Sequence, residues 1–118
     1  MKKFKKLEWQ TITRKRDLER LYKSIIPVLR AEARKCGYGL GVHGSLQRDL
    51  DLIAVPWVTK HVKPLTLALR LHSSVSKYEV SGHWLHVTKN VTTKPCGRLA
   101  YAMYLGTHAY IDLSVMPA

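Results

Sequence analysis

The first regular pattern of apolar residues in the chain begins at Asp17 and has the spacing of a helix. Apolar side chains then recur every three or four residues: Leu18, Leu21, Tyr22, Ile25, Leu29, Ala33 and Cys36. This spacing places them on one face of an α-helix, for which Asp17 is a suitable cap and Gly37 a suitable stop. Pro27 lies inside the run and removes one backbone hydrogen bond, so we expect a kink or the start of a second segment there.

The rest of the pattern predicts two strands, a helix and then about four strands. The first two strands are predicted at residues 38–43 and 49–55, the later ones at 78–80, 83–88, 98–105 and 108–115. Pro64 is well placed to begin the helix, which we expect to run to about residue 76 with Leu65, Leu69 and then His72 or Val75 on its buried side. The polar stretch 89–97 is predicted to be a loop. This order is typical of an α+β fold, a mixed β-sheet packed against two or three helices.

Asp49 and Asp51 interrupt the second predicted strand, which is otherwise apolar. Because side chains alternate between the faces of a strand, both carboxylates point to one face, about 7 Å apart. Two such charges repel each other unless a cation lies between them, and carboxylate oxygens are ligands of hard cations. Asp112 interrupts the apolar stretch 109–115 in the same way. Aspartate is disfavoured in strands, so three such positions indicate a functional site, and neighbouring strands would bring all three carboxylates to one cation site.

The composition bounds the size and the partners of the protein. A chain of 118 residues is predicted to form one domain, here residues 17–118, preceded by a basic N-terminal arm at residues 1–16. The formal net charge is +12, and such a field favours polyanions such as nucleic acid or nucleotides. The alternative is a solvated basic surface with no particular ligand.

Two cysteines, Cys36 and Cys96, are too few and too isolated for a disulfide framework. We therefore expect reduced thiols and a cytoplasmic location. No apolar run approaches the roughly 20 residues that span a bilayer, so no membrane association is expected. The lysine-rich start leads into no apolar segment of the signal-peptide type.

The aspartates and the turn before them resemble the nucleotidyltransferases of the DNA polymerase β-like superfamily, in particular its minimal single-domain members. The shared pattern is a strand that ends in Gly-Ser, an Asp-x-Asp that opens the next strand, and a third aspartate on a later strand. In this chain the pattern is Gly44-Ser45, Asp49-x-Asp51 and Asp112. The resemblance implies an enzyme that moves a nucleoside monophosphate from an NTP to a hydroxyl of RNA, protein or a small molecule.

The resemblance also implies roles for the three aspartates. Asp49 and Asp51 would hold two Mg²⁺ ions, or Mn²⁺, that bridge the triphosphate. Asp112 would bind one of these ions and help to activate the acceptor hydroxyl. A two-metal clamp supplies the positioning and charge neutralisation that phosphoryl transfer requires.

Phosphate binding is implied for Gly44 and Ser45, through backbone N–H groups and the serine hydroxyl. Nearby cations could also grip phosphates, and the candidates are Arg48, Lys94 and Arg98. The chain departs from the family in one respect, because only residues 46–48 separate Gly-Ser from the first aspartate, where the family usually has a longer stretch with a short helix. This departure leaves open a trimmed site, a different donor, or a degenerate protein that binds without catalysing.

Two other functions are compatible with the sequence. His43-x-Ser45 and His86-x-Thr88 have the form of the paired motifs of two-histidine phosphoesterases, in which histidines act as general acid and base. A basic domain of this kind could also be a non-catalytic nucleic-acid-binding module, whose affinity would fall with salt. Small members of the resembled family often work with a partner protein, and the sequence does not show whether this one does.

Overall fold

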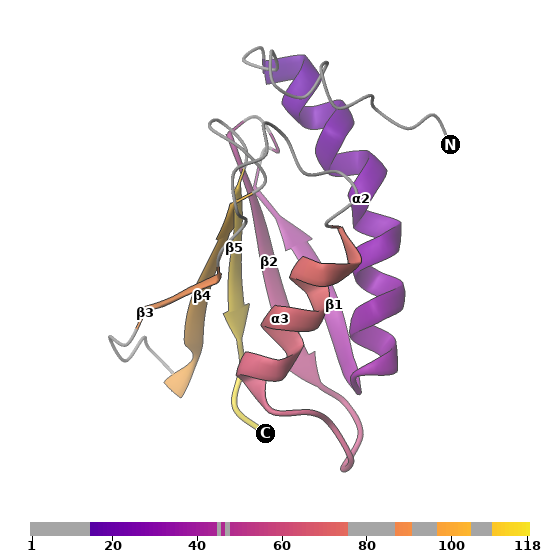
Figure 1. Ribbon diagram of the computed structural model, residues 1–118, viewed down its shortest axis with the longest axis vertical. Helices are drawn as coiled ribbons and strands as arrows, with labels where there is room; N and C mark the ends of the chain where they lie inside the picture. Colours follow the sequence, from indigo (N-terminus) through magenta and orange to yellow (C-terminus); the bar gives the residue numbers. More distant parts are fainter. Residues whose placement is uncertain (1–14, 45, 47, 76–86, 91–96, 105–109) are drawn as a thin grey trace.

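In the computed structural model of the chain, residues 15–44, 46, 48–75, 87–90, 97–104 and 110–118 are described. Within them, two helices cover one face of a five-stranded sheet (Figure 1). The elements in chain order are α2 (Lys15–Lys35), β1 (Tyr38–His43), β2 (Asp49–Pro56), α3 (Pro64–Ser74), β3 (Val87–Asn90), β4 (Leu99–Tyr104) and β5 (Tyr110–Val115).

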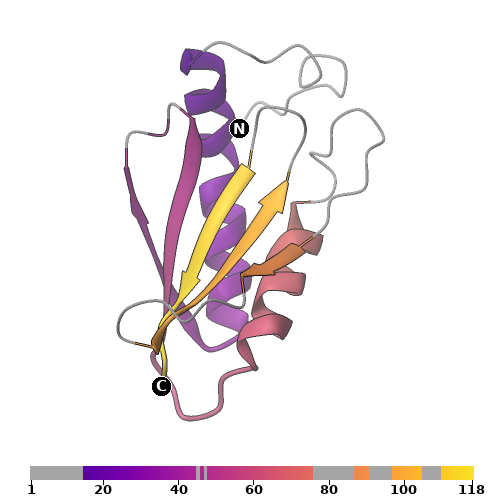
Figure 2. The same ribbon diagram turned by 90° about the vertical axis from the view of Figure 1, so that its left-hand side faces the viewer.

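The sheet has the order β1-β2-β5-β4-β3. β2 and β5 run parallel, and the other neighbouring strands are antiparallel. Figure 2 shows the strands in front of both helices, so the second face of the sheet carries no helix among the described elements. The fold is therefore the predicted α+β arrangement, a mixed sheet packed against helices.

The apolar face of α2 forms much of the core. The seven apolar positions that define the helical pattern, from Leu18 to Cys36, are all buried. The helix is continuous through Pro27, so the prediction of a second segment is wrong. Pro27 is exposed, which leaves its missing N–H on the solvent side, away from the core. The helix also begins two residues before Asp17, which is inside it and not at its cap.

The predicted buried side of α3 is wrong in part. Leu65 and Leu69 are 47% and 51% exposed, whereas Leu67, Ala68 and Leu71 are buried. Val75, one of the two predicted alternatives after them, is fully buried. Apolar residues lie on two sides of this helix, so periodicity alone did not distinguish them. The packing of α3 against α2 and the β3–β4 side of the sheet selects the Leu67 side.

The later strands agree with the prediction only in part. β4 and β5 lie within the predicted segments 98–105 and 108–115, of which residues 105, 108 and 109 are outside the described part. β3 includes Lys89 and Asn90, which were predicted to begin a loop, because these residues pair with Tyr101 and Ala100 of β4. The predicted strand 78–80, the turns at 81–82 and 106–107, and residues 1–14 and 91–96 lie outside the described residues. In the described part, no helix is long and apolar enough to cross a membrane.

Gly37, between α2 and β1, anchors the loop that follows β2. Its carbonyl accepts a hydrogen bond from the Trp57 N–H at 3.1 Å, and the neighbouring Cys36 carbonyl accepts one from the Val62 N–H at 3.0 Å. Gly37 has a φ of +88°, and a Cβ there would lie 2.9 Å from both the Cα of His61 and the carbonyl oxygen of Lys60. Only glycine fits this position without displacing the loop.

We therefore predict that Gly37→Ala lowers the free energy of unfolding. The strained backbone conformation alone costs about 1–3 kcal/mol, and the clash with the backbone of residues 60 and 61 adds to this cost. Urea denaturation monitored by circular dichroism would measure the change. Gly41→Ala is the matched control, because the nearest atom to its Cβ is 3.9 Å away and its φ is not positive. Equal stability of the two variants would contradict this account of Gly37.

Candidate functional site

The strand register brings the three aspartates to one region of the sheet. Asp51 of β2 is the direct Cα partner of Asp112 of β5, and Asp49 lies two residues earlier on β2, opposite Tyr110. Leu50 and the other alternate residues of β2 point into the core, whereas Asp49 and Asp51 are half-buried. The carboxylates therefore lie on the sheet face opposite the two helices. The condition for the three aspartates to share one region, that β2 and the strand of Asp112 are neighbours, is therefore met.

Two tyrosines complete one side of this region. The Tyr110 hydroxyl donates a hydrogen bond to Oδ2 of Asp49 at 2.9 Å. Burial, together with the hydrogen bond to the Asp49 carboxylate and its charge, raises the pKa of Tyr110 to about 12. The ring of Tyr104, from β4, stacks on that of Tyr110 with a centroid distance of 5.6 Å. Alternation along the strand puts Tyr110 on the same face as Asp112, but no role was predicted from the sequence for either tyrosine.

Asp51 has an ionisable residue beside it on each neighbouring strand, His43 on β1 and Asp112 on β5. Burial raises its pKa, as do the charges of Asp112 and Asp49, whereas His43 opposes this effect. His43 is the Cα partner of Asp51 across the β1–β2 pair. An added positive charge would relieve the repulsion between these carboxylates.

The glycine turn after β1 lies against the same carboxylate. Gly44 has a φ of +86°, and a Cβ at this position would lie 2.8 Å from Oδ2 of Asp51. The missing side chain thus lets the backbone approach the Asp51 carboxylate closely. Gly44, which was predicted to bind phosphate, therefore lies beside Asp51, which was predicted to bind metal. Ser45, the other half of the motif, lies outside the described residues.

The predicted phosphate-binding cations are placed differently from one another. Arg48 is exposed at the start of β2, and its carbonyl oxygen accepts a hydrogen bond from the hydroxyl of Tyr22 on α2 at 2.5 Å. Burial raises the pKa of this tyrosine well above its ordinary value. Arg98 donates a hydrogen bond from Nη1 to Oγ of Ser114 at 3.2 Å, at the end of β5 away from Asp49. Lys94 and His86 lie outside the described residues.

The donor chemistry of the three aspartates fits a hard divalent cation. Among the residues that the structure describes, no group of three or more His, Cys, Asp or Glu side chains is placed so that it could hold a metal ion. Magnesium sites that act on phosphates usually need only one or two carboxylates, because the substrate supplies further oxygens. The paired positions of Asp51 and Asp112 meet that requirement in residue type, number and strand register.

Comparisons with known proteins give similarity in fold alone. No family model matches the chain, and no curated protein matches it. A structure of Cid1 poly(U) polymerase with MgGTP bound is similar over 92% of this chain, with a TM-score of 0.52 and 13% sequence identity. A second structure, of Cid1 as an RNA terminal uridylyl transferase, is similar over 96% of the chain, with a TM-score of 0.50 and 13% identity. This chain spans about a third of those chains (35% and 32%). The fold is thus nucleotidyltransferase-like.

The raised pKa of Asp51 predicts a pH dependence of stability. A carboxyl group whose pKa is higher in the folded than in the unfolded state destabilises the protein as the pH rises through the folded pKa. Asp51→Asn should therefore raise the midpoint of thermal unfolding at pH 7 in EDTA. The gain should shrink as the pH falls and disappear below about pH 3, which is under the ordinary aspartate pKa of about 3.9, so that the carboxyl is protonated in both states.

The control for this measurement is Glu19→Gln, which removes a carboxylate on α2 that pairs with Lys23 at 3.2 Å. This variant should show no such gain. If the Asp51→Asn protein is less stable than the wild type at pH 7, and by the same amount at pH 3, the destabilisation by burial and repulsion described above is contradicted.

Proposed function

We propose that the protein is a Mg²⁺-dependent nucleotidyltransferase that moves a nucleoside monophosphate from an NTP to a hydroxyl acceptor. The observation that carries this proposal is the register of Asp51 against Asp112 on parallel strands. Asp49 lies on the same face of the sheet, the one opposite α2 and α3. The fold supports it, because a similar fold occurs in a poly(U) polymerase whose structure contains MgGTP. Mn²⁺ is an alternative cation.

In this proposal Asp49 and Asp51 bind the cation, and Asp112 contributes to the same site. Bound Mg²⁺ would neutralise charge on the triphosphate and lower the barrier to displacement. The Tyr110 hydroxyl, which donates to Asp49 Oδ2, would hold that carboxylate in one orientation while it bound a cation. Tyr110 is thus a positioning residue.

The reaction forms a bond between the acceptor oxygen and the α-phosphorus and breaks the bond to the β-phosphate, so that pyrophosphate leaves. Asp112 would accept a hydrogen bond from the acceptor hydroxyl and take its proton. The carboxylate of Asp112 suits this role because the residue is half-buried on the sheet face opposite α2 and α3, so part of it is exposed to solvent.

The phosphates are assigned to the turn after β1. The left-handed conformation of Gly44 brings the backbone against Asp51, so phosphates bound by N–H groups of this turn would lie beside the metal-binding carboxylate. Ser45, Arg48 and Lys94 are proposed to add a hydroxyl and two cations. Arg98 uses one guanidinium donor on Ser114, which leaves others for a phosphate near Asp112.

One second candidate has an observation in its favour. The net charge of +12 suits a nucleic-acid-binding module of the same fold in which the carboxylates are structural. The double variant Asp49→Ala, Asp51→Ala separates the two functions, because it should abolish transfer and spare or strengthen polyanion binding.

The His43–His86 phosphoesterase stays a prediction, since only His43, opposite Asp51, is among the described residues.

The proposed function predicts that a non-hydrolysable NTP binds in the presence of Mg²⁺ or Mn²⁺. Asp51→Asn should weaken this binding at least tenfold. Loss of one charged ligand to a phosphate-bound cation costs more than the 1.4 kcal/mol that corresponds to a factor of ten. Isothermal titration calorimetry with and without metal measures both quantities. Absence of nucleotide binding by the wild type with either metal would refute the transferase.

The proposed function also predicts the effect of a substitution at Gly44. Gly44→Ala should weaken metal-dependent nucleotide binding, because the new Cβ displaces Oδ2 of Asp51, and it should lower stability by about 1–2 kcal/mol through the strained φ. Gly41→Ala, three residues earlier on β1, is the control that should change neither quantity by as much. Equal nucleotide affinities of the two variants would show that the turn does not position Asp51.

A further inference from the structure

A pocket lies at the opposite end of β1 and β2 from the aspartates. Its volume is about 330 Å³, and it is lined by Arg30, Arg34, Tyr38, Gly39, Leu40 and Trp57. The lining combines two arginines with two aromatic side chains and contains no carboxylate. Trp57 is six residues beyond Asp51, which corresponds to about 20 Å along an extended strand. The pocket is therefore separate from the proposed nucleotidyltransferase site.

Trp57 is held by its backbone while its side chain stays open to solvent. Its N–H donates to the Gly37 carbonyl, and the far end of the same loop is fixed by the Val62 N–H, which donates to the Cys36 carbonyl. The Tyr38 hydroxyl donates to the Val62 carbonyl at 2.6 Å. The tryptophan residue is nevertheless 66% exposed. A large aromatic ring on a fixed loop is a preorganised surface for stacking, and such exposure brings no folding benefit.

The two arginines add positive charge beside this ring. Arg30 and Arg34 are one turn apart on the same face of α2, and both are exposed. The ion pairs found among the described residues include Lys23–Glu19 and Arg70–Glu32, and neither pocket arginine is paired with a carboxylate in that part of the chain. Like charges at this spacing repel, and an anion between them would remove the repulsion.

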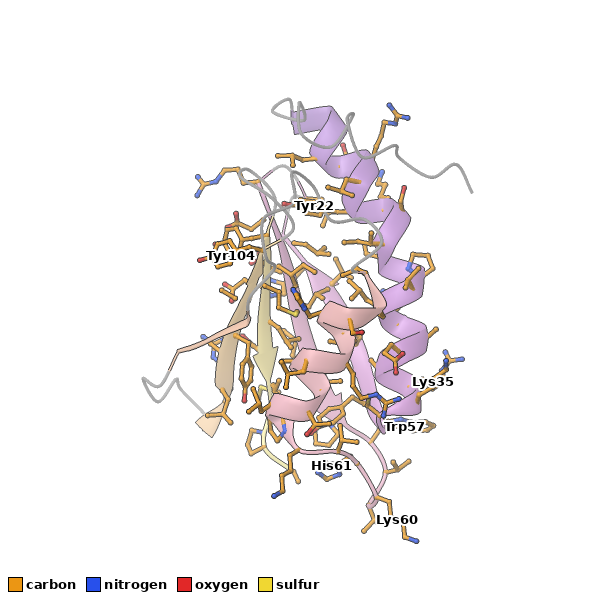
Figure 3. The ribbon with its side chains drawn as sticks, viewed as in Figure 1. Tyr22, Lys35, Trp57, Lys60, His61 and Tyr104 are labelled. Atoms are coloured by element: carbon orange, nitrogen blue, oxygen red, sulfur yellow. The ribbon has the colours of Figure 1, made fainter. Side chains whose placement is uncertain are left out.

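Two lysines lie at the same end of the molecule as the pocket. Figure 3 shows Lys35, Lys60 and His61 at the same end of the molecule as Trp57, whereas Tyr22 and Tyr104 lie toward the other end. Lys35 and Lys60 are exposed. His61 is fixed at the edge of the Tyr38 ring, with a centroid distance of 5.4 Å. Lys35 and Lys60 thus add positive charge at this end of the molecule, beyond that of the two arginines.

We propose that this pocket binds single-stranded nucleic acid, with one base stacked on Trp57 and adjacent phosphates bound by Arg30 and Arg34. Aromatic stacking beside a basic groove is how proteins bind single strands without sequence preference. A duplex would not fit, because its paired bases do not expose their faces. An acidic peptide would satisfy the arginines but would leave the exposed indole ring without a partner.

The test is fluorescence anisotropy of a labelled single-stranded oligonucleotide with the full chain at several salt concentrations. EDTA is present, so the result is independent of the proposed metal-dependent transferase. Trp57→Ala should weaken binding roughly tenfold, which is the effect of losing one stacked base, and Trp57→Phe should retain most of the affinity. Val58→Ala, the neighbouring exposed apolar position, is the control that should leave the affinity unchanged.

The arginines are tested through the salt dependence of the same affinity. Arg30→Gln and Arg34→Gln should each reduce the slope of log affinity against log salt concentration by about 0.7, the value for one lost phosphate contact on a single strand. Lys23→Gln is the matched loss of one charge on α2, about two turns earlier, and should leave the slope unchanged.

Three outcomes would overturn the proposal. The first is an affinity of Trp57→Ala equal to that of Val58→Ala. The second is a salt slope of the arginine variants equal to that of Lys23→Gln. The third is competition by an oligoglutamate as effective as that by an unlabelled oligonucleotide of equal charge, which would assign the pocket to an acidic protein.

Discussion

The parallel pairing of β2 with β5 is the constraint on which the rest of the structure depends. On the core side, Leu50, Leu52 and Ala54 lie beside Ile111, Leu113 and Val115, and all six are buried. Burial of each leucine or isoleucine contributes about 1.5–3 kcal/mol. A shift of one residue would turn these side chains to the open face, so the apolar side determines the register. That register places Asp51 beside Asp112, and the repulsion between them is tolerated because the core contribution is larger.

The β1–β2 pair gives the molecule two chemically different ends. At one end, Gly44 brings the backbone against the carboxylate of Asp51. At the other end, Gly37 allows the loop after β2 to pack closely, and this loop carries Trp57. Both glycines have positive φ, so each end depends on a backbone conformation that other residues rarely adopt. One pair of strands thus holds an acidic site and a basic, aromatic one apart.

The two sites differ in what they offer a nucleic acid or nucleotide. The aspartate face has oxygen donors and needs a cation before it can approach a phosphate, because carboxylates and phosphates repel each other. The Trp57 pocket has its cations built in and requires no metal. A strongly basic chain can therefore contain a cluster of aspartates, provided that positive charge lies elsewhere on the surface, as it does around Arg30 and Arg34.

The sequence by itself determined the features that depend on local periodicity. The buried face of α2, the strands β1 and β2, and the shared face of Asp49 and Asp51 follow from spacings of three to four residues or of two. The glycines also predicted where elements end, because Gly37 and Gly44 occupy positions at which the backbone adopts a positive φ. The α+β class followed from the order of these elements.

Only the tertiary structure decided which distant segments meet. The pairing of β2 with β5, about sixty residues later, is a non-local choice that no local pattern encodes, and it turned three separate aspartates into a candidate site. The buried side of α3 was decided in the same way, because apolar residues on both sides left the choice to packing against α2 and the sheet. The hydrogen bond from Tyr110 to Asp49 and the pocket around Trp57 were likewise invisible in the sequence, since each depends on elements that come together only in the folded chain.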